Sequence, residues 1–395
     1  MKKTAILTLY NNNNNYGGLA QAYALWKHLK NNGFETEIID YKMQRGITGT
    51  LKDRLNAQVH SNGLKAIFEK GKYIFTKIIG KKESSRNRKK LLTYSEDLSK
   101  RKACFQEFRN QIPHSREYTA DTICQSIDDY DIFISGSDQI WKPGVIQDAF
   151  VLKFVPEEKR KISYATSIAV SNIQRREWFC KYLVEHLSSY SVLSVREEST
   201  AKELQDVLQR DVSCVVDPTL LLDKQEWEAL ASKRLVDKKY LFAYLLGKSK
   251  KQRDFIKDYA KEKGLIIVSI PFAGGEYVES DTDFGEYRLF EVGLPEFFSL
   301  IKYAEVVFTD SFHAVCFSRI FQRNFYVMER KVEASGDKMN SRIDSILKIM
   351  DLQDRMIDVE TCSSLHGEID YENVEKCLAP YIAYSKDYLN KAMLG

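Results

Sequence analysis

The chain has 395 residues, a length typical of two or three domains. Hydrophobic residues make up 44% and charged residues 29%, as in ordinary globular proteins, and the net charge of +4 is too small to indicate nucleic-acid binding by itself. The cysteines number seven and form no CxxC pair, which favours reduced thiols over a disulfide framework and predicts no metal site.

The first apolar run, 4–9, is too short for a signal-peptide core and predicts a strand. An asparagine-rich loop follows, and then apolar residues recur at helical spacing from Leu19 to Leu29, with Gly33 at the expected helix cap. Residues 34–41 predict a second strand, which completes the first unit of a parallel sheet. Since no run approaches the ~18 apolar residues of a membrane-spanning helix, we expect a cytoplasmic protein.

Residues 45–115 interrupt this alternation with a basic stretch that we predict to be a largely helical insertion. Within it, 64–82 place apolar residues on one helical face with lysines interleaved. Such a stretch either packs on the protein as a solvated helix or lies on an anionic membrane surface. The second alternative would hold the protein at the inner face of a membrane.

The alternation of strands and helices then resumes and continues to the end of the chain. The charged stretch 223–238 is predicted to link a first domain, 1–222, to a second, 239–360, and 371–392 to form a final helix. The predicted fold class is therefore α/β, with two Rossmann-like domains that face each other across a cleft. In such sheets ligands bind beyond the carboxyl ends of the strands, so the loops there should carry the chemistry.

His313 is the strongest candidate for chemistry. It lies in the first turn of a helix predicted to begin near Phe312, directly after an apolar strand. Backbone N–H groups and the helix dipole favour an anion there, and an imidazole can donate a proton or bind a phosphate. Alternatively, Asp310 or Ser311 is just a helix cap and His313 a buried, satisfied side chain.

Two arginines are candidate anion ligands. Arg196 directly follows a predicted strand, and its planar guanidinium suits a carboxylate or phosphate, although an ion pair with Glu197 or Glu198 is the alternative. Arg342 falls in the first turn of a late helix, where a cation needs a compensating anion. That anion is either Asp344 or a bound phosphate or carboxylate.

Two loops add further candidates. Glycine after the strand 130–136 permits close backbone approach, and Asp138 could act as a base or simply form a turn. The loop before the first helix would let a ligand reach that helix N-terminus, though it is not a GxGxxG motif. The candidates for catalysis are His313, Asp138 and Asp310. The candidates for substrate contact are Arg196, Arg342, Ser311, Asn15, Tyr16, Gly17, Gly136 and Ser137.

Seven segments, in this order, resemble the polysaccharide pyruvyl transferase family. They are NNYGGLAQAYAL, FISGSDQIW, ISYATSI, LSVREESTAKEL, VVDPTLLL, TDSFHAVCFS and NSRID. No single segment is specific, but the ordered set is. The resemblance implies a GT-B-like fold and transfer of the pyruvyl group of phosphoenolpyruvate to two hydroxyls of a sugar, in a polysaccharide or its lipid-linked precursor. A pyruvate ketal forms and phosphate is released, and no cofactor is implied.

The resemblance also implies roles for single residues. His313 matches the family's histidine, and Arg196 matches an arginine in contact with the donor. Many members carry an arginine two residues before the histidine, where this chain has Ser311. We expect Arg342 to replace it, and we expect Arg196, Arg342 and His313 to line one cavity. By its chemistry, His313 could be the acid or could protonate the leaving phosphate, and Asp138 or Asp310 could be the base.

Two other functions remain open. A GT-B glycosyltransferase that uses a nucleotide sugar would need a carboxylate for the ribose in the second domain, where Glu329 and Asp283 are candidates. A non-catalytic carbohydrate-binding relative is the second alternative, because a fold alone does not fix a function. Ser311 in place of the arginine keeps that alternative open.

Overall fold

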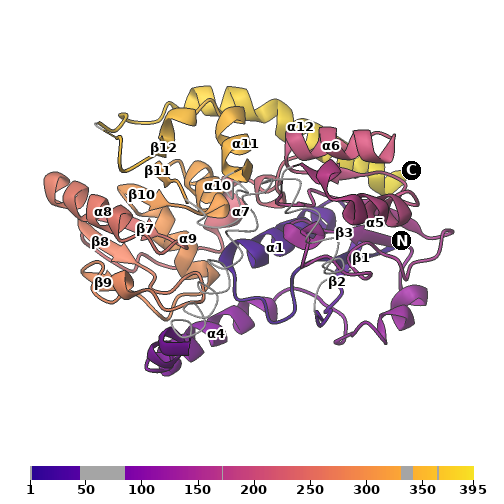
Figure 1. Ribbon diagram of the computed structural model, residues 1–395, viewed down its shortest axis with the longest axis horizontal. Coiled ribbons are helices and arrows are strands. Elements are labelled where there is room, and N and C mark those ends of the chain that lie inside the picture. The colour runs from indigo at the N-terminus through magenta and orange to yellow at the C-terminus, as the bar shows by residue number, and fades with distance from the viewer. Residues whose placement is uncertain (1, 45–84, 171, 331–340, 363) are drawn as a thin grey trace, which may run out of the picture.

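The computed structural model describes residues 2–44, 85–170, 172–330, 341–362 and 364–395. Two parallel sheets, each covered by helices, lie side by side with α1 and α10 between them (Figure 1). We call β1–β6 with their helices the first lobe, and β7–β12 with theirs the second lobe. The α/β fold of two Rossmann-like units is thus confirmed.

The first lobe holds a parallel sheet of order β2-β1-β3-β4, which isolated parallel bridges continue to the pair β5-β6. The strands β1 and β3 are buried on both faces, as expected of short apolar runs covered by helices. The strands are β1 (Lys3–Leu7), β2 (Glu35–Ile38), β3 (Ile132–Ser135), β4 (Arg160–Ser163), β5 (Ser194–Val195) and β6 (Ser213–Cys214). The helices are α1 (Tyr16–Asn31), α5 (Glu177–Leu187) and α6 (Glu198–Leu208).

The second lobe holds a sheet of order β12-β11-β10-β7-β8-β9, with every pair parallel. The strands are β7 (Tyr240–Tyr244), β8 (Ile266–Ser269), β9 (Tyr287–Arg288), β10 (Val306–Thr309), β11 (Asn324–Met328) and β12 (Met356–Ile357). The helices are α8 (Lys250–Lys263), α9 (Leu294–Lys302), α10 (Phe312–Ile320) and α11 (Ser341–Ile349). The short strand β9 forms one edge of this sheet.

One hydrophobic cluster is continuous through both lobes. It runs from Ile134 in β3 through Leu25 in α1 to Phe297 in α9 and Val307 in β10. The helix α1 is buried on nearly all sides, because it packs against its own sheet and also against α9 and α10. Apolar packing therefore holds the two lobes together, and it fixes the positions of polar groups that lie between them.

The stretch 223–238, predicted to be a linker, is anchored in the core. It contains the helix α7 (Lys224–Glu228), which begins with a capping box of Asp223 and Glu226. Trp227 is fully buried with its ring edge-on to Phe298 and Phe317. This aromatic contact fixes the connection between the lobes rather than leaving it free.

The insertion in the first lobe reaches the second. Its described part is helical over 85–92 and in α4 (Ser95–Arg109). In α4, Arg101 is buried and donates hydrogen bonds to three carbonyl oxygens of the second lobe, those of Pro271, Leu289 and Phe290. Residues 45–84, and with them the basic face predicted over 64–82, lie outside the described residues. Both alternatives for that face, packing on the protein and contact with a membrane, therefore stay predictions.

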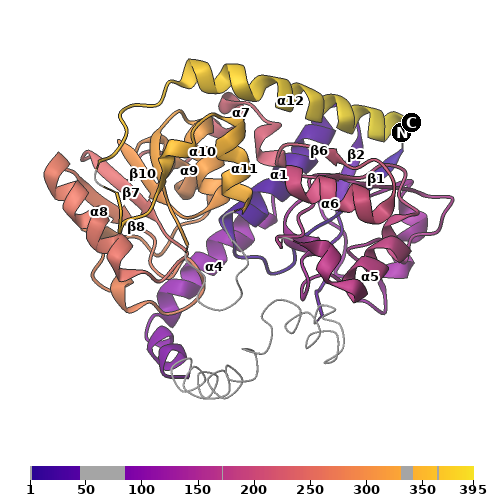
Figure 2. The ribbon, with the colours of Figure 1, turned by 45° about the horizontal axis from the view of Figure 1, so that its top comes forward.

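The final helix, α12 (Tyr371–Leu394), crosses both lobes (Figure 2). Near its start, the Tyr371 hydroxyl donates to the carbonyl of Arg323 in the second lobe. Farther along, the Ser385 hydroxyl accepts from the backbone N–H of Val216, and Arg160 donates to the carbonyl of Ala392 at 2.7 Å, both in the first lobe. Among the described residues, no helix is long and apolar enough to cross a membrane.

The buried His28 near the end of α1 makes stability depend on pH. Burial lowers its pKa to about 4, and the nearby Lys386 adds to this effect. The unfolded chain, with an imidazole pKa of about 6.5, binds the proton more readily. This contribution is therefore fully present above about pH 6.5 and is lost as the pH falls toward 4.

We expect the free energy of unfolding to fall by about 1–3 kcal/mol over this window through His28 alone. The His28→Gln variant should show a flatter curve of stability against pH, measured by urea denaturation at several pH values between about 4.5 and 7. An unchanged slope in this variant would contradict the assignment.

Candidate active site

The candidate residues meet at the seam between the lobes. The first lobe contributes loops that follow the carboxyl ends of β3, β5 and β6, together with the start of α1. The second lobe contributes the starts of α10 and α11. This is the edge at which parallel sheets of this kind bind ligands.

Arg196 lies at the centre of this seam with its side chain 1% exposed. Its Nη1 donates to Asp217 Oδ2 at 2.7 Å, its Nη2 lies 3.3 Å from Asp138 Oδ1, and its Nε lies 3.5 Å from Glu197 Oε1. Burial opposes the charge, but these three carboxylates outweigh it and raise the pKa of Arg196. The guanidinium also lies 4.8 Å from the ring centre of Phe312, across the seam.

Asp217, to which the sequence pattern assigned no role, connects the site. Its Oδ2 accepts from Arg196 and from the Ser137 hydroxyl, and its Oδ1 accepts from the backbone N–H and hydroxyl of Thr219. Its Oδ2 also lies 3.5 Å from His313 Nε2. Burial opposes its ionisation, but His313, Arg196 and the Thr219 N–H hold the pKa of Asp217 well below its usual range.

His313 reaches the first lobe from the first turn of α10, as the sequence predicted for its place in the helix. Its Nε2 faces Asp217, and among the described residues no hydrogen bond to that nitrogen is formed. The other side of the ring lies against the start of α1, where a Cβ added to Gly17 would lie 1.9 Å from His313 Nδ1. Only a glycine at position 17 leaves room for this imidazole.

Arg342 lies on the second-lobe side of the same seam. Its guanidinium faces the Gln139 amide, whose oxygen, turned toward it, accepts from Nη2 at 2.6 Å and Nη1 at 2.9 Å. Burial and the nearby charges of Arg196 and Arg330 lower the pKa of Arg342 to about 10, although Asp138 and Glu197 act in the opposite direction. Arg342 and Arg196 are thus close enough to repel each other.

The loop after β3 has an unusual backbone. Asp138 has φ 77° and ψ −173°, a region that residues with a side chain rarely adopt and that costs on the order of 1–3 kcal/mol. The preceding turn is tight, since a Cβ on Gly136 would lie 3.1 Å from side-chain atoms of Ile6 and Thr8. The Thr8 hydroxyl holds the turn by donating to the carbonyl of Ser137. This turn directs the Asp138 carboxylate toward Arg196.

Asp310 and Ser311 have contacts of a different kind. The carboxylate of Asp310 is fully buried and accepts from the backbone N–H groups of Leu246 and Gly247 at 2.7 Å each. Burial raises its pKa, and Arg330, with Nε 3.7 Å away, counteracts this. Ser311 occupies the N-cap position of α10, but its side chain makes no capping hydrogen bond.

The candidates at the start of α1 are engaged within the protein. The Asn15 side chain caps the helix by accepting from the N–H of Gly18 at 2.9 Å. Tyr16 is buried, stacks on Phe297 and donates its hydroxyl proton to the carbonyl of Val292. In this arrangement both residues hold α1 in place.

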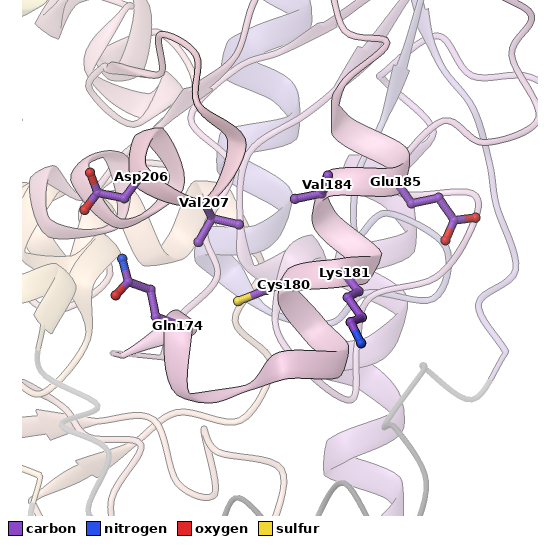
Figure 3. A pocket seen from close by; sticks show the side chains of 7 residues that line it. All are labelled: Gln174, Cys180, Lys181, Val184, Glu185, Asp206 and Val207. Atoms are coloured by element: carbon purple, nitrogen blue, oxygen red, sulfur yellow. The ribbon is translucent and has the colours of Figure 1, made fainter.

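Arg196, Asp217 and His313, at the centre of the site, are buried in this arrangement. Several of its buried polar atoms have no hydrogen-bond partner among the described residues, namely Arg196 Nε, Glu197 Oε2, His313 Nε2 and Arg330 Nε. Pockets elsewhere on the described part of the chain are lined by other residues. One lies on the outside of the first lobe between α5 and α6, lined by Cys180, Val184 and Val207 among others (Figure 3). The common cavity expected for Arg196, Arg342 and His313 is not among these pockets.

The two carboxylates considered for a nucleotide ribose, Glu329 and Asp283, have different surroundings. Glu329 directly follows β11, and its backbone carbonyl accepts from Gln252. Asp283 has an exposed side chain 3.8 Å from Lys257. Within the described residues, no group of three or more His, Cys, Asp or Glu side chains could hold a metal ion.

The model of the polysaccharide pyruvyl transferase family matches residues 15–331. The chain belongs to this family. The match includes Arg196, Asp217 and His313, and it ends before Arg342. No curated protein matches the chain.

Solved structures show which fold this pyruvyl transferase family member has. The UDP-GlcNAc 2-epimerase from Methanocaldococcus jannaschii is 12% identical, with a TM-score of 0.54 and 100% of both chains covered. A trehalose-6-phosphate synthase is 10% identical, with a TM-score of 0.51, over 100% of this chain and 99% of that one. These similarities confirm the GT-B fold.

The contact between Gly17 and His313 can be tested by stability. The Gly17→Ala variant should lower the free energy of unfolding by about 1–3 kcal/mol, because the added methyl group overlaps the imidazole. Alanine would otherwise favour the helix by up to about 1 kcal/mol. Gly367→Ala, where nothing lies within 4 Å of the added carbon, is the control.

A double variant identifies the overlapping group. Combining Gly17→Ala with His313→Ala removes the overlap, so the two losses should sum to clearly more than the loss of the double variant. Denaturant unfolding of all four proteins provides the cycle. Additive losses would show that His313 does not press on Gly17.

Proposed function

We propose that this protein transfers the pyruvyl group of phosphoenolpyruvate to two hydroxyl groups of a saccharide. The observation that carries the proposal is the meeting of Arg196, His313 and Arg342 at one seam, from segments far apart in the sequence. Phosphoenolpyruvate carries a phosphate and a carboxylate on three carbons, and guanidinium groups are suited to bind both. The membership of the chain in the polysaccharide pyruvyl transferase family supports the same choice.

The donor would lie between Arg196 and Arg342. Arg196 is already surrounded by carboxylates, of which Asp138 makes the longer hydrogen bond, at 3.3 Å against 2.7 Å for Asp217. A donor anion would therefore compete with Asp138 for Arg196, while the shorter hydrogen bond between Arg196 and Asp217 would remain. Since the Arg196 side chain is buried, neighbouring side chains have to move aside for the donor to reach it.

The reaction needs one proton donor and one acceptor. One saccharide hydroxyl adds to the central carbon of the donor while the methylene carbon gains a proton. The bond from the central carbon to the phosphate oxygen then breaks, and the second hydroxyl adds to the central carbon as it loses its proton. Of the two hydroxyl protons, one ends on the new methyl group and the other on the released phosphate. General acid and base groups assist such steps by about 10²–10⁴-fold each.

His313 is the proposed acid, and Asp138 is the preferred base. The Asp138 side chain is 13% exposed, whereas that of Asp310 is fully buried with both oxygens engaged by backbone N–H groups. A substrate hydroxyl could approach Asp138 with little rearrangement. Asp310 instead holds the turn after β7, close to Arg330.

The acceptor is proposed to be a saccharide of a polysaccharide or of its lipid-linked precursor. Such an acceptor is long.

The alternative function is that of a glycosyltransferase that uses a nucleotide sugar as its donor, in line with the GT-B fold. Purified protein can be tested by thermal shift with phosphoenolpyruvate and with several nucleotide sugars. Stabilisation by phosphoenolpyruvate alone supports the proposal, and stabilisation by a nucleotide sugar alone overturns it.

The His313→Ala variant tests the chemical role. We expect it to lower the rate of phosphate release in the presence of phosphoenolpyruvate and saccharide by about 10²–10⁴-fold, with donor binding largely kept. Circular dichroism confirms that the variant is folded. A folded variant with wild-type turnover would exclude His313 as the acid. Donor binding without any phosphate release by the wild type would favour a non-catalytic relative.

A further inference from the structure

Gln139 holds the side chain of Arg342 across the seam. Its amide oxygen accepts from both terminal nitrogens of the guanidinium, at 2.6 and 2.9 Å. The amide must present its oxygen here, because its NH₂ group would face N–H donors. A fork of two N–H groups on one acceptor is also the way in which arginine binds carboxylate or phosphate oxygens.

Arg342 is half-buried, and its hydrogen-bond partner among the described residues is neutral, which is costly for a guanidinium. Among the described residues, no carboxylate oxygen lies within ion-pair distance of this side chain, whereas Arg196 has three such partners. The charges of Arg196 and Arg330 add repulsion. A half-buried cation without an opposite charge is stabilised by any anion that reaches it.

The backbone of Gln139 is held in place by the residues that follow it. The residue begins a short 3-10 helix, Gln139–Trp141, directly after the strained Asp138. The next residues, Ile140 and Trp141, are fully buried, and the Trp141 indole donates to the carbonyl of Phe150 at 3.0 Å. Rotation of the Gln139 side chain would therefore uncover Arg342 without moving the loop.

We propose that the Gln139 amide oxygen occupies the place of a donor anionic group on Arg342 and that Gln139 thereby sets the affinity for the donor. The inference rests on the proposed function, since the anion is a carboxylate or phosphate of phosphoenolpyruvate. The donor displaces the amide and brings a negative charge to Arg342. Gln139 is then a specificity-determining residue: it satisfies the guanidinium of Arg342 in the free protein and admits only a ligand that binds Arg342 better than a neutral amide.

The Gln139→Glu variant gives the sharpest test. The substitution keeps the shape and supplies Arg342 with a permanent carboxylate, so two effects of opposite direction are expected. The melting temperature of the ligand-free protein should rise by about 2 °C or more, because the guanidinium gains a charged partner. The affinity for phosphoenolpyruvate, measured by isothermal titration calorimetry, should fall at least about tenfold.

Gln125→Glu is the matched control. Gln125 also accepts from an arginine, Arg116 at 2.8 Å, but on the exposed surface of the first lobe. This variant should change neither the melting temperature nor the donor affinity beyond error. A second variant, Gln139→Ala, should lower the melting temperature of the free protein but show a larger stabilisation by the donor than the wild type shows.

The outcomes separate this inference from the proposed function. If the wild type binds no phosphoenolpyruvate, the proposed function fails. If the wild type binds it and Gln139→Glu binds it equally well, the function stands and the role of Gln139 is overturned. If Gln139→Glu loses both stability and affinity, Gln139 is only a structural residue. Inorganic phosphate serves as a second titrant, and it should compete with phosphoenolpyruvate in the wild type.

Discussion

The contact of one buried carboxylate with both lobes governs the whole seam. Asp217 lies in the first lobe, 2.7 Å from a nitrogen of Arg196 and 3.5 Å from His313 Nε2 in the second lobe. A carboxylate without exposure is costly unless it is paired, and hydrogen bonds from Thr219 complete its coordination. Because its pKa is held low, Asp217 stays charged, and its charge fixes the guanidinium and the imidazole relative to each other.

This arrangement divides the cations of the seam into two kinds. The charge of Arg196 is balanced by three carboxylates, and these carboxylates also hold its side chain in place. Arg342 has only an amide as its hydrogen-bond partner among the described residues and carries charge that its partner does not balance. We expect the binding energy for an anion to come mainly from Arg342. That expectation agrees with the absence of an arginine at position 311, where Ser311 leaves the start of α10 without a cation of its own.

The alternation of strands and helices could be predicted, because hydrophobic periodicity is a local property of the sequence. The rule that ligands bind beyond the carboxyl ends of strands led to Arg196, Asp138 and His313, which the structure brings together. Asp217 escaped notice because an aspartate before a proline is also a common turn residue, and its importance comes from distant partners. Trp227 shows the same limit: its stretch is charged enough to predict a linker, while its indole is buried against both neighbouring helices.

Two backbone features in the first lobe decide how closely the second lobe can approach. At position 17 the missing side chain admits the imidazole of His313, and at Asp138 a positive φ turns the chain so that Gln139 faces Arg342. A Cβ at position 17 or an ordinary negative φ at Asp138 would move the lobes apart. Hydrogen bonds such as the one between Gln139 and Arg342 would then break, because they form only over short distances. The strain at Asp138 is therefore offset by the contacts that it makes possible, as is common where a backbone is held in a rare conformation at a functional site.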